Sequence, residues 1–261
     1  MAGEIPSYGE LLTALVGLSP LAVGTAAAMT FGASVIRGLT GFGMAIIMVP
    51  LLDLLIPPAQ AVVLAIVLQL LIGPVGLGKI LRDAHRPSAV PLSAVAMAGT
   101  PLGIAALTAV SPDVARLLIA MVALAAFALI LLPQLPAGHR PGRVAIGLTG
   151  AASGVLNGFA AMPGPPIVPF YLRQSIDPAE ARASMMLIFF ATSMAGTLAA
   201  WWAGLINGPL LALAMLLFAP MMLGNWLGGM AFGRVPAALW RSIVGVVLGI
   251  AGAGAVARIL V

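Results

Sequence analysis

The sequence predicts an all-α polytopic membrane protein, and three observations lead to this fold class. Hydrophobic residues make up 62% of the 261 positions, whereas Asp, Glu, Lys and Arg together make up 7%. Soluble domains carry about 25% charged residues, so a water-soluble fold of this size could not cover its surface with so few charges. The same scarcity of charge excludes disorder, because disordered chains are polar and charge-rich. The apolar runs are long and continuous, whereas a transmembrane β-barrel shows short alternating strands.

Six apolar runs have the length of about 20 residues that a membrane-spanning helix needs. They cover residues 59–81, 89–110, 114–132, 179–203, 209–232 and 238–257. Two other regions, 21–55 and 143–172, are predicted to be broken helices, because each contains glycines or prolines inside an apolar run. Glycine lets the chain turn sharply, and proline removes a helical donor and clashes with the preceding turn. The residues expected to break them are Gly38, Gly41 and Gly43 in the first region, and Gly158, Pro163, Gly164, Pro165 and Pro166 in the second.

The distribution of positive charge predicts how these regions thread. If each broken region enters the membrane and returns to the same side, nine cations lie inside and two outside, with Arg37 in the membrane region. If each broken region crosses once, six cations lie inside and five outside. The positive-inside rule favours the first threading, which places both termini outside.

The two halves of the chain resemble each other at a spacing near 120 residues. The segment from Pro58 to Ala61 matches the segment from Pro178 to Ala181, and Gly38 matches Gly158, in both cases at an offset of 120. With the favoured threading each half has five membrane passes. Because five is an odd number, the second half starts on the opposite side of the membrane, so the halves must be inverted relative to each other. Inverted repeats with broken helices at matching positions are typical of secondary transporters. We expect a first repeat over residues 1–132, a linker over 133–142 and a second repeat over 143–261, which together function as one transmembrane domain.

The first candidate site is the motif that runs from Arg37 to Gly43, in which Arg37, Gly38, Thr40, Gly41 and Gly43 are the candidate substrate-binding residues. Glycines expose backbone N–H groups, and the start of a helix after a break attracts anions. A guanidinium is suited to oxyanions, and an intramembrane charge is a functional candidate by default. The alternative is that Arg37 extends to the cytoplasmic interface and serves no substrate.

The second candidate site is the corresponding motif from Asn157 to Pro166, in which Asn157, Gly158, Met162 and Gly164 are the candidates. Asn157 aligns with Arg37 in the repeat and offers both a donor and an acceptor. Backbone without helical partners survives at membrane depth only where it is buried in protein or lines a wet cavity. The alternative is a purely structural turn. Gln69, whose repeat counterpart is near Phe189, could line the same pathway or form a hydrogen bond between helices.

The sequence indicates transport rather than catalysis. It contains no catalytic cluster, no P-loop and no cysteine, so we expect neither an enzyme, nor a metal site, nor any cofactor. The net charge of +5 is explained by membrane topology rather than by nucleic-acid binding. The lipid bilayer is therefore the expected environment, and a homodimer is possible.

At its two motifs the chain resembles the TauE/SafE family of sulfite-exporter-like permeases. The resemblance rests on residues 37–43, the following Pro50, and residues 158–169, and it extends over essentially the whole chain. It implies a multi-pass protein of a bacterial-type inner membrane that moves a small sulfur-containing anion such as sulfite, sulfoacetate or another organosulfonate. The leading hypothesis is a permease that works by alternating access at a site between the two broken-helix motifs. A passive anion channel and a non-transporting membrane subunit are the alternatives.

Overall fold

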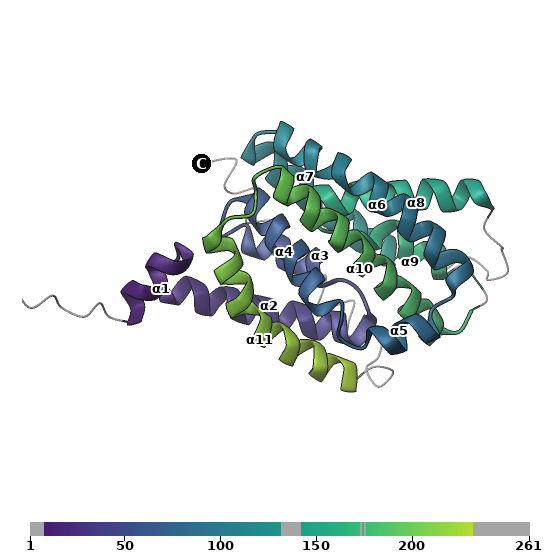
Figure 1. Ribbon diagram of the computed structural model, residues 1–261, viewed down its shortest axis with the longest axis horizontal. Helices are drawn as coiled ribbons and strands as arrows, with labels where there is room; N and C mark the ends of the chain where they lie inside the picture. Colours follow the sequence, from purple (N-terminus) through teal and green to yellow (C-terminus); the bar gives the residue numbers. More distant parts are fainter. Residues whose placement is uncertain (1–7, 132–141, 173, 175, 232–261) are drawn as a thin grey trace, which may run out of the picture.

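The computed structural model describes residues 8–131, 142–172, 174 and 176–231, and every element in these residues is a helix (Figure 1). The helices are α1 (Tyr8–Val16), α2 (Pro20–Thr40), α3 (Met44–Leu52), α4 (Pro58–Ile72), α5 (Leu77–Asp83), α6 (Arg86–Ala109), α7 (Pro112–Leu131), α8 (Arg143–Ala160), α9 (Gly164–Leu172), α10 (Pro178–Trp202) and α11 (Gly208–Met230). The predicted all-α class is therefore confirmed for this part of the chain. The short helix α1 was not predicted.

The long helices lie where the apolar runs predicted them. Helices α6, α7, α10 and α11 begin and end within a few residues of the predicted spans 89–110, 114–132, 179–203 and 209–232. By length and composition, four helices of the described part could cross a membrane, namely α2, α6, α10 and α11. A fifth span results if the bent pair α4 and α5 is counted as one. The predicted span 238–257 and nearly all of the linker 133–142 lie outside the described residues.

The predicted span over residues 59–81 is not one continuous helix. Helix α4 ends at Ile72, and α5 continues from Leu77 at an angle of 84°. Pro74 lacks a backbone donor and its ring clashes with the preceding turn, which favours a break at this point. Gly76 then adopts a φ of +74°, which favours glycine. The apolar composition is continuous across this bend, which explains why hydropathy alone missed it.

Helix α4 lies at the centre of the molecule. Its residues 61–68 are almost completely buried, and it packs against α3, α7, α8, α10 and α11. A helix that is hydrophobic on all sides is expected in such a central position. The outer faces are apolar as well, with Leu21 82% and Trp202 80% exposed. Exposed apolar surface of this kind fits a protein whose outer helices contact lipid.

Two closely packed helix pairs lie on either side of α4 (Figure 1). One pair is α2 with α11, and the other is α8 with α6. Helices α2 and α6 come from the first half of the chain, whereas α8 and α11 come from the second. Each half therefore contributes one helix to each pair. The elements also correspond at the predicted offset, because α9 begins 120 residues after the start of α3 and ends 120 residues after its end. The inversion of the two halves remains a prediction.

Candidate functional site between the two helix breaks

The first break, residues 41–43, separates α2 from α3. Gly41 has a φ of +83° and Gly43 a φ of +90°, and both values favour glycine. The Gly41 amide donates to the Arg37 carbonyl at 2.7 Å, which closes α2 with a left-handed cap. The Thr40 hydroxyl accepts from the Phe42 amide at 3.2 Å and lies 2.9 Å from the Ile36 carbonyl. These local bonds allow the chain to leave α2 and start α3 within three residues.

The second break, residues 161–163, separates α8 from α9 at corresponding positions. Ala161 has a φ of +57°, the one non-glycine positive φ among the described residues. The Ala161 amide donates to the Asn157 carbonyl at 2.7 Å, and the Met162 amide to the Leu156 carbonyl at 3.2 Å. The Ala161–Asn157 bond is that of a left-handed αL cap, which ends many helices. The Ser153 hydroxyl then donates to the Pro163 carbonyl at 2.7 Å, so the turn is held from within α8.

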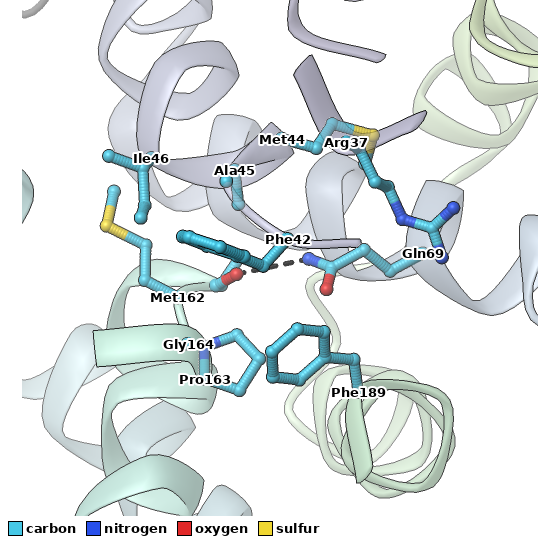
Figure 2. A pocket seen from close by; sticks show the side chains of 12 residues that line it. Arg37, Phe42, Met44, Ala45, Ile46, Gln69, Met162, Pro163, Gly164 and Phe189 are labelled. Atoms are coloured by element: carbon cyan, nitrogen blue, oxygen red, sulfur yellow. Dashed lines mark hydrogen bonds between the residues drawn. The ribbon is translucent and has the colours of Figure 1, made fainter. Parts of the chain in front are cut away.

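A small cavity forms where the two breaks meet (Figure 2). Its first wall, from the first half of the chain, consists of Arg37, residues 42–46 and Gln69. Its second wall, from the second half, consists of residues 161–164 and Phe189. The space open to water-molecule centres is about 20 Å³, enough for about one water molecule. Figure 2 shows the Gln69 amide beside the cavity, where its Nε2 donates to the Ala161 carbonyl at 3.1 Å and joins the two walls.

Arg37 supplies the positive charge of this cavity. Its side chain is buried, with 7% exposed, and one guanidinium nitrogen donates to Asn225 Oδ1 of α11 at 2.9 Å. No acidic residue lines the cavity, and the ion pairs found in the described part of the chain both involve Arg116. A second cation lies near, because Arg182 Nη2 donates to the Gly38 carbonyl at 2.9 Å. The guanidinium is therefore buried against a neutral amide, so its charge remains available to an anion.

The structure brings together five of the ten residues predicted to bind substrate. The cavity is lined by Arg37, Gly43, Gln69, Met162 and Gly164. The other five, Gly38, Thr40, Gly41, Asn157 and Gly158, do not line it. Asn157 is completely buried, and its Nδ2 donates to the Thr192 carbonyl at 3.1 Å. Thr40 and Gly41 shape the first break from outside the cavity.

Gly38 and Gly158 were expected to break their helices, and this expectation is wrong. Helix α2 continues through Gly38 to Thr40, and α8 continues through Gly158 to Ala160. A Cβ at Gly38 would clash with the Asn225 carbonyl of α11, and a Cβ at Gly158 would clash with the Thr100 carbonyl of α6. Both glycines therefore let two backbones approach closely, as small residues do in membrane helix pairs. In the second region the break also comes before Pro165 and Pro166, which lie in the first turn of α9, where proline is tolerated.

Several residues that line or adjoin the cavity were not among the candidates, and three of them are informative. Phe189 lines the cavity at the repeat position of Gln69, so the 120-residue offset could have found it. Asn225 is a polar residue in an apolar helix, but its pairing with Arg37 joins residues 188 positions apart. Arg182 lies in the first turns of α10, where the sequence suggested only a topological charge. Within the described ranges no group of three or more His, Asp or Glu side chains could hold a metal ion.

Comparisons with known proteins place these features in a family context. A family model described as Sulfite exporter TauE/SafE matches residues 26–255, which include both breaks and every residue that lines the cavity. A relative from Cupriavidus necator, described as probable sulfite/organosulfonate exporter TauE, is 28% identical over 93 residues. That alignment covers 36% of this chain and 36% of the relative. No solved structure matches the chain.

Proposed function

Because this chain belongs to the sulfite exporter TauE/SafE family, it is a membrane transporter and not an enzyme, and we propose that it is a secondary transporter for a small sulfur-containing anion. The substrate class includes sulfite, sulfoacetate and other organosulfonates, in keeping with the description of the Cupriavidus necator relative. The membrane is the inner, or plasma, membrane. Transport is driven by substrate or ion gradients.

The substrate site lies in the cavity between the two breaks. The observation that carries this proposal is the buried Arg37 guanidinium, which lines a cavity built from both halves of the chain and free of acidic residues. Helix α3 begins at this cavity without a side-chain cap, so its first N–H groups add partial positive charge. A buried guanidinium and a helix N-terminus together favour an oxyanion.

Alternating access is supported by the way the halves are joined. The Gln69–Ala161 hydrogen bond joins the two walls, and each half contributes one helix to each of the two closely packed pairs. Movement of one repeat against the other would open the cavity first to one side of the membrane and then to the other. A cavity with room for about one water must widen before it can hold an anion of four or more heavy atoms.

The small cavity also favours a carrier over a passive anion channel, because a conducting pore needs a continuous wet path. Electrical recording from the purified protein in planar bilayers separates the two. Saturable flux without unitary currents supports the carrier, whereas unitary currents would support the channel. No described feature favours a non-transporting subunit.

The decisive experiment measures the flux of labelled sulfite and labelled organosulfonates in proteoliposomes that contain the purified chain. Arg37→Gln removes the charge but keeps a polar side chain, and we expect flux to fall about tenfold or more, since a hydrogen bond to a charged group contributes about 1.5–3 kcal/mol. The matched control is Arg86→Gln, which removes an exposed arginine outside the cavity and should leave flux unchanged. Equal flux in the native protein and Arg37→Gln would contradict the site, and no flux of any sulfur anion would contradict the substrate class.

A further inference from the structure

The two walls of the cavity come from corresponding repeat positions, but they differ in chemistry. At the offset of 120 residues Arg37 corresponds to Asn157, Gln69 to Phe189, and residues 44–46 to residues 164–166. If both walls offered similar donors, the site would suit an anion with charge on all sides. The comparison of these three pairs therefore indicates what kind of anion the cavity fits.

The first wall holds both polar side chains of the cavity. Arg37 and Gln69 line it, each with 7% of its surface exposed. Residues 44–46, which also line it, form the uncapped first turn of α3, and none of them is a proline. A guanidinium, an amide and a helix N-terminus therefore converge from one side. This wall can bind several oxygens of one anionic group.

The second wall lacks every one of these groups. Asn157 stands where the first wall has Arg37, but it is completely buried, does not line the cavity and donates to Thr192. Phe189 stands where the first wall has Gln69. Two of the first three residues of α9, Pro165 and Pro166, have no N–H group.

Apolar groups fill the second wall instead. The side chains that line it include Met162, Pro163 and Phe189, and the Ala161 carbonyl already accepts from Gln69. Figure 2 shows Pro163 and Phe189 on the side of the cavity opposite Arg37 and Met44. A Cβ at Gly164 would lie 3.7 Å from Cζ of Phe189 and 3.8 Å from Cδ2 of Phe42, so both rings reach this glycine. Any group that contacts this wall would lose water without gaining a hydrogen-bond donor.

We propose that the substrate is a monoanionic alkylsulfonate, with its sulfonate on the first wall and its short carbon chain on the second, and that Phe189 is the specificity-determining residue. This inference rests on the proposed function. Inorganic sulfite with its three oxygens on the first wall has no carbon chain to bury against Phe189, and sulfoacetate would turn its carboxylate there without a donor. An alkyl chain has no such cost and gains from burial against Phe189 and Met162. Because each wall is built on its own break, the walls keep their chemistry when the breaks move apart to admit the anion.

The test compares three probes, ethanesulfonate, sulfite and sulfoacetate, as competitors of labelled ethanesulfonate flux in proteoliposomes of the full chain. We expect ethanesulfonate to compete at a concentration about tenfold or more below that of the other two, a ratio within the range seen for hydrophobic pockets. Phe189→Gln, which copies the first wall's Gln69, should reduce this preference at least about tenfold and improve competition by sulfoacetate. Phe189→Leu keeps an apolar wall and should retain the preference, and it serves as the matched control.

The outcomes separate the two proposals. If sulfite or sulfoacetate competes as well as ethanesulfonate in the native chain, the monoanionic alkylsulfonate is wrong while the transport function stands. If Phe189→Leu loses the preference as completely as Phe189→Gln, Phe189 does not act through its apolar character. If none of the three anions is transported or competes, the proposed function itself fails. The comparison of the three probes on the native chain decides the substrate class even if Phe189→Gln does not fold.

Discussion

Glycines that look alike in the sequence have different roles in this protein. Gly158 lies inside α8, where a Cβ would clash with the Thr100 carbonyl of α6. Gly164 begins α9 beside the cavity, where a Cβ would make ordinary contact with Phe189 and Phe42. The first glycine therefore serves helix packing, and the second keeps the cavity open.

This difference predicts that one alanine substitution lowers stability and the other lowers transport. Gly158→Ala should destabilise the protein by about 1–3 kcal/mol, because two backbones would have to separate. Gly164→Ala should leave stability nearly unchanged but lower transport about tenfold, because the added methyl fills a cavity with room for one water. Unfolding in detergent and flux per folded protein measure the two effects. A stable Gly158→Ala variant, or a Gly164→Ala variant with native flux, would contradict this assignment.

Ala161 carries backbone strain at the second break. Its φ of +57° lies in the left-handed region, where a Cβ costs about 1–2 kcal/mol. Its counterpart in the first break, Gly41, has a φ of +83° without that cost. The two breaks therefore share a left-handed residue, but Ala161 adopts this conformation with backbone strain and Gly41 adopts it without strain.

We expect Ala161→Gly to raise the free energy of unfolding by about 0.5–1 kcal/mol, which is the relieved strain minus the added freedom of glycine in the unfolded chain. Gly41→Ala should do the reverse, because it adds the same strain and places a Cβ 2.6 Å from Cγ of Arg182. Chemical denaturation of both variants in detergent gives the comparison. A destabilised Ala161→Gly variant would show that the left-handed cap is not strained.

At the scale of elements, the short helix α3 is held at both ends. Its start forms part of the cavity, and its end, at Asp53, is joined to α7 by an ion pair between Asp53 Oδ2 and Arg116 Nε at 2.8 Å. Both side chains are largely buried, with 13% of Arg116 and 6% of Asp53 exposed. A helix of nine residues is too short to be stable alone, so this contact helps to hold its position.

Asp53→Asn should therefore reduce stability by about 1.5–3 kcal/mol, because Arg116 would lose its buried partner and keep only the exposed Asp113. The matched control is Asp113→Asn, which removes the other partner of Arg116. That carboxylate is 78% exposed, so its loss should cost less than about 1 kcal/mol. Denaturation curves of the two variants test the difference, and equal losses would mean that burial does not decide the strength of these pairs.

At the scale of the whole molecule, two closely packed helix pairs lie around α4, and each pair takes one helix from each half of the chain. The pairs α2 with α11 and α8 with α6 are joined through backbone contacts at glycines, so each pair is suited to move as a unit. The two breaks lie between these pairs, next to α4. This arrangement explains how a small change at the cavity could be transmitted to long helices.

The favoured threading can be tested by cysteine labelling, because the native chain contains no cysteine. Ser111 and Asp83 are both exposed, and the threading places Ser111 outside and Asp83 inside. In intact cells, an impermeant thiol reagent should label Ser111→Cys without permeabilisation and Asp83→Cys only after it. The opposite pattern would overturn the orientation, and labelling of both in intact cells would overturn the threading.

The sequence by itself determined the fold class, most helix positions and the two regions in which helices are broken. These features depend on local composition: apolar runs long enough to cross a bilayer, and glycine or proline where a helix cannot continue. It also determined the correspondence of the halves, since a fixed offset is visible without coordinates. The candidates Arg37, Gln69, Met162 and Gly164 followed from the same patterns, and all four line the cavity.

Only the tertiary structure decided which residues of each motif face one another. Gly38 and Gly41 differ by three positions, yet Gly38 lies inside α2 and contacts α11, whereas Gly41 lies just past the end of α2 and closes it. The pairing of Arg37 with Asn225, and the placing of Phe189 opposite Arg37, depend on contacts between distant parts of the chain. Local sequence patterns carry no information about such contacts, since they arise from the packing of helices that are remote in sequence.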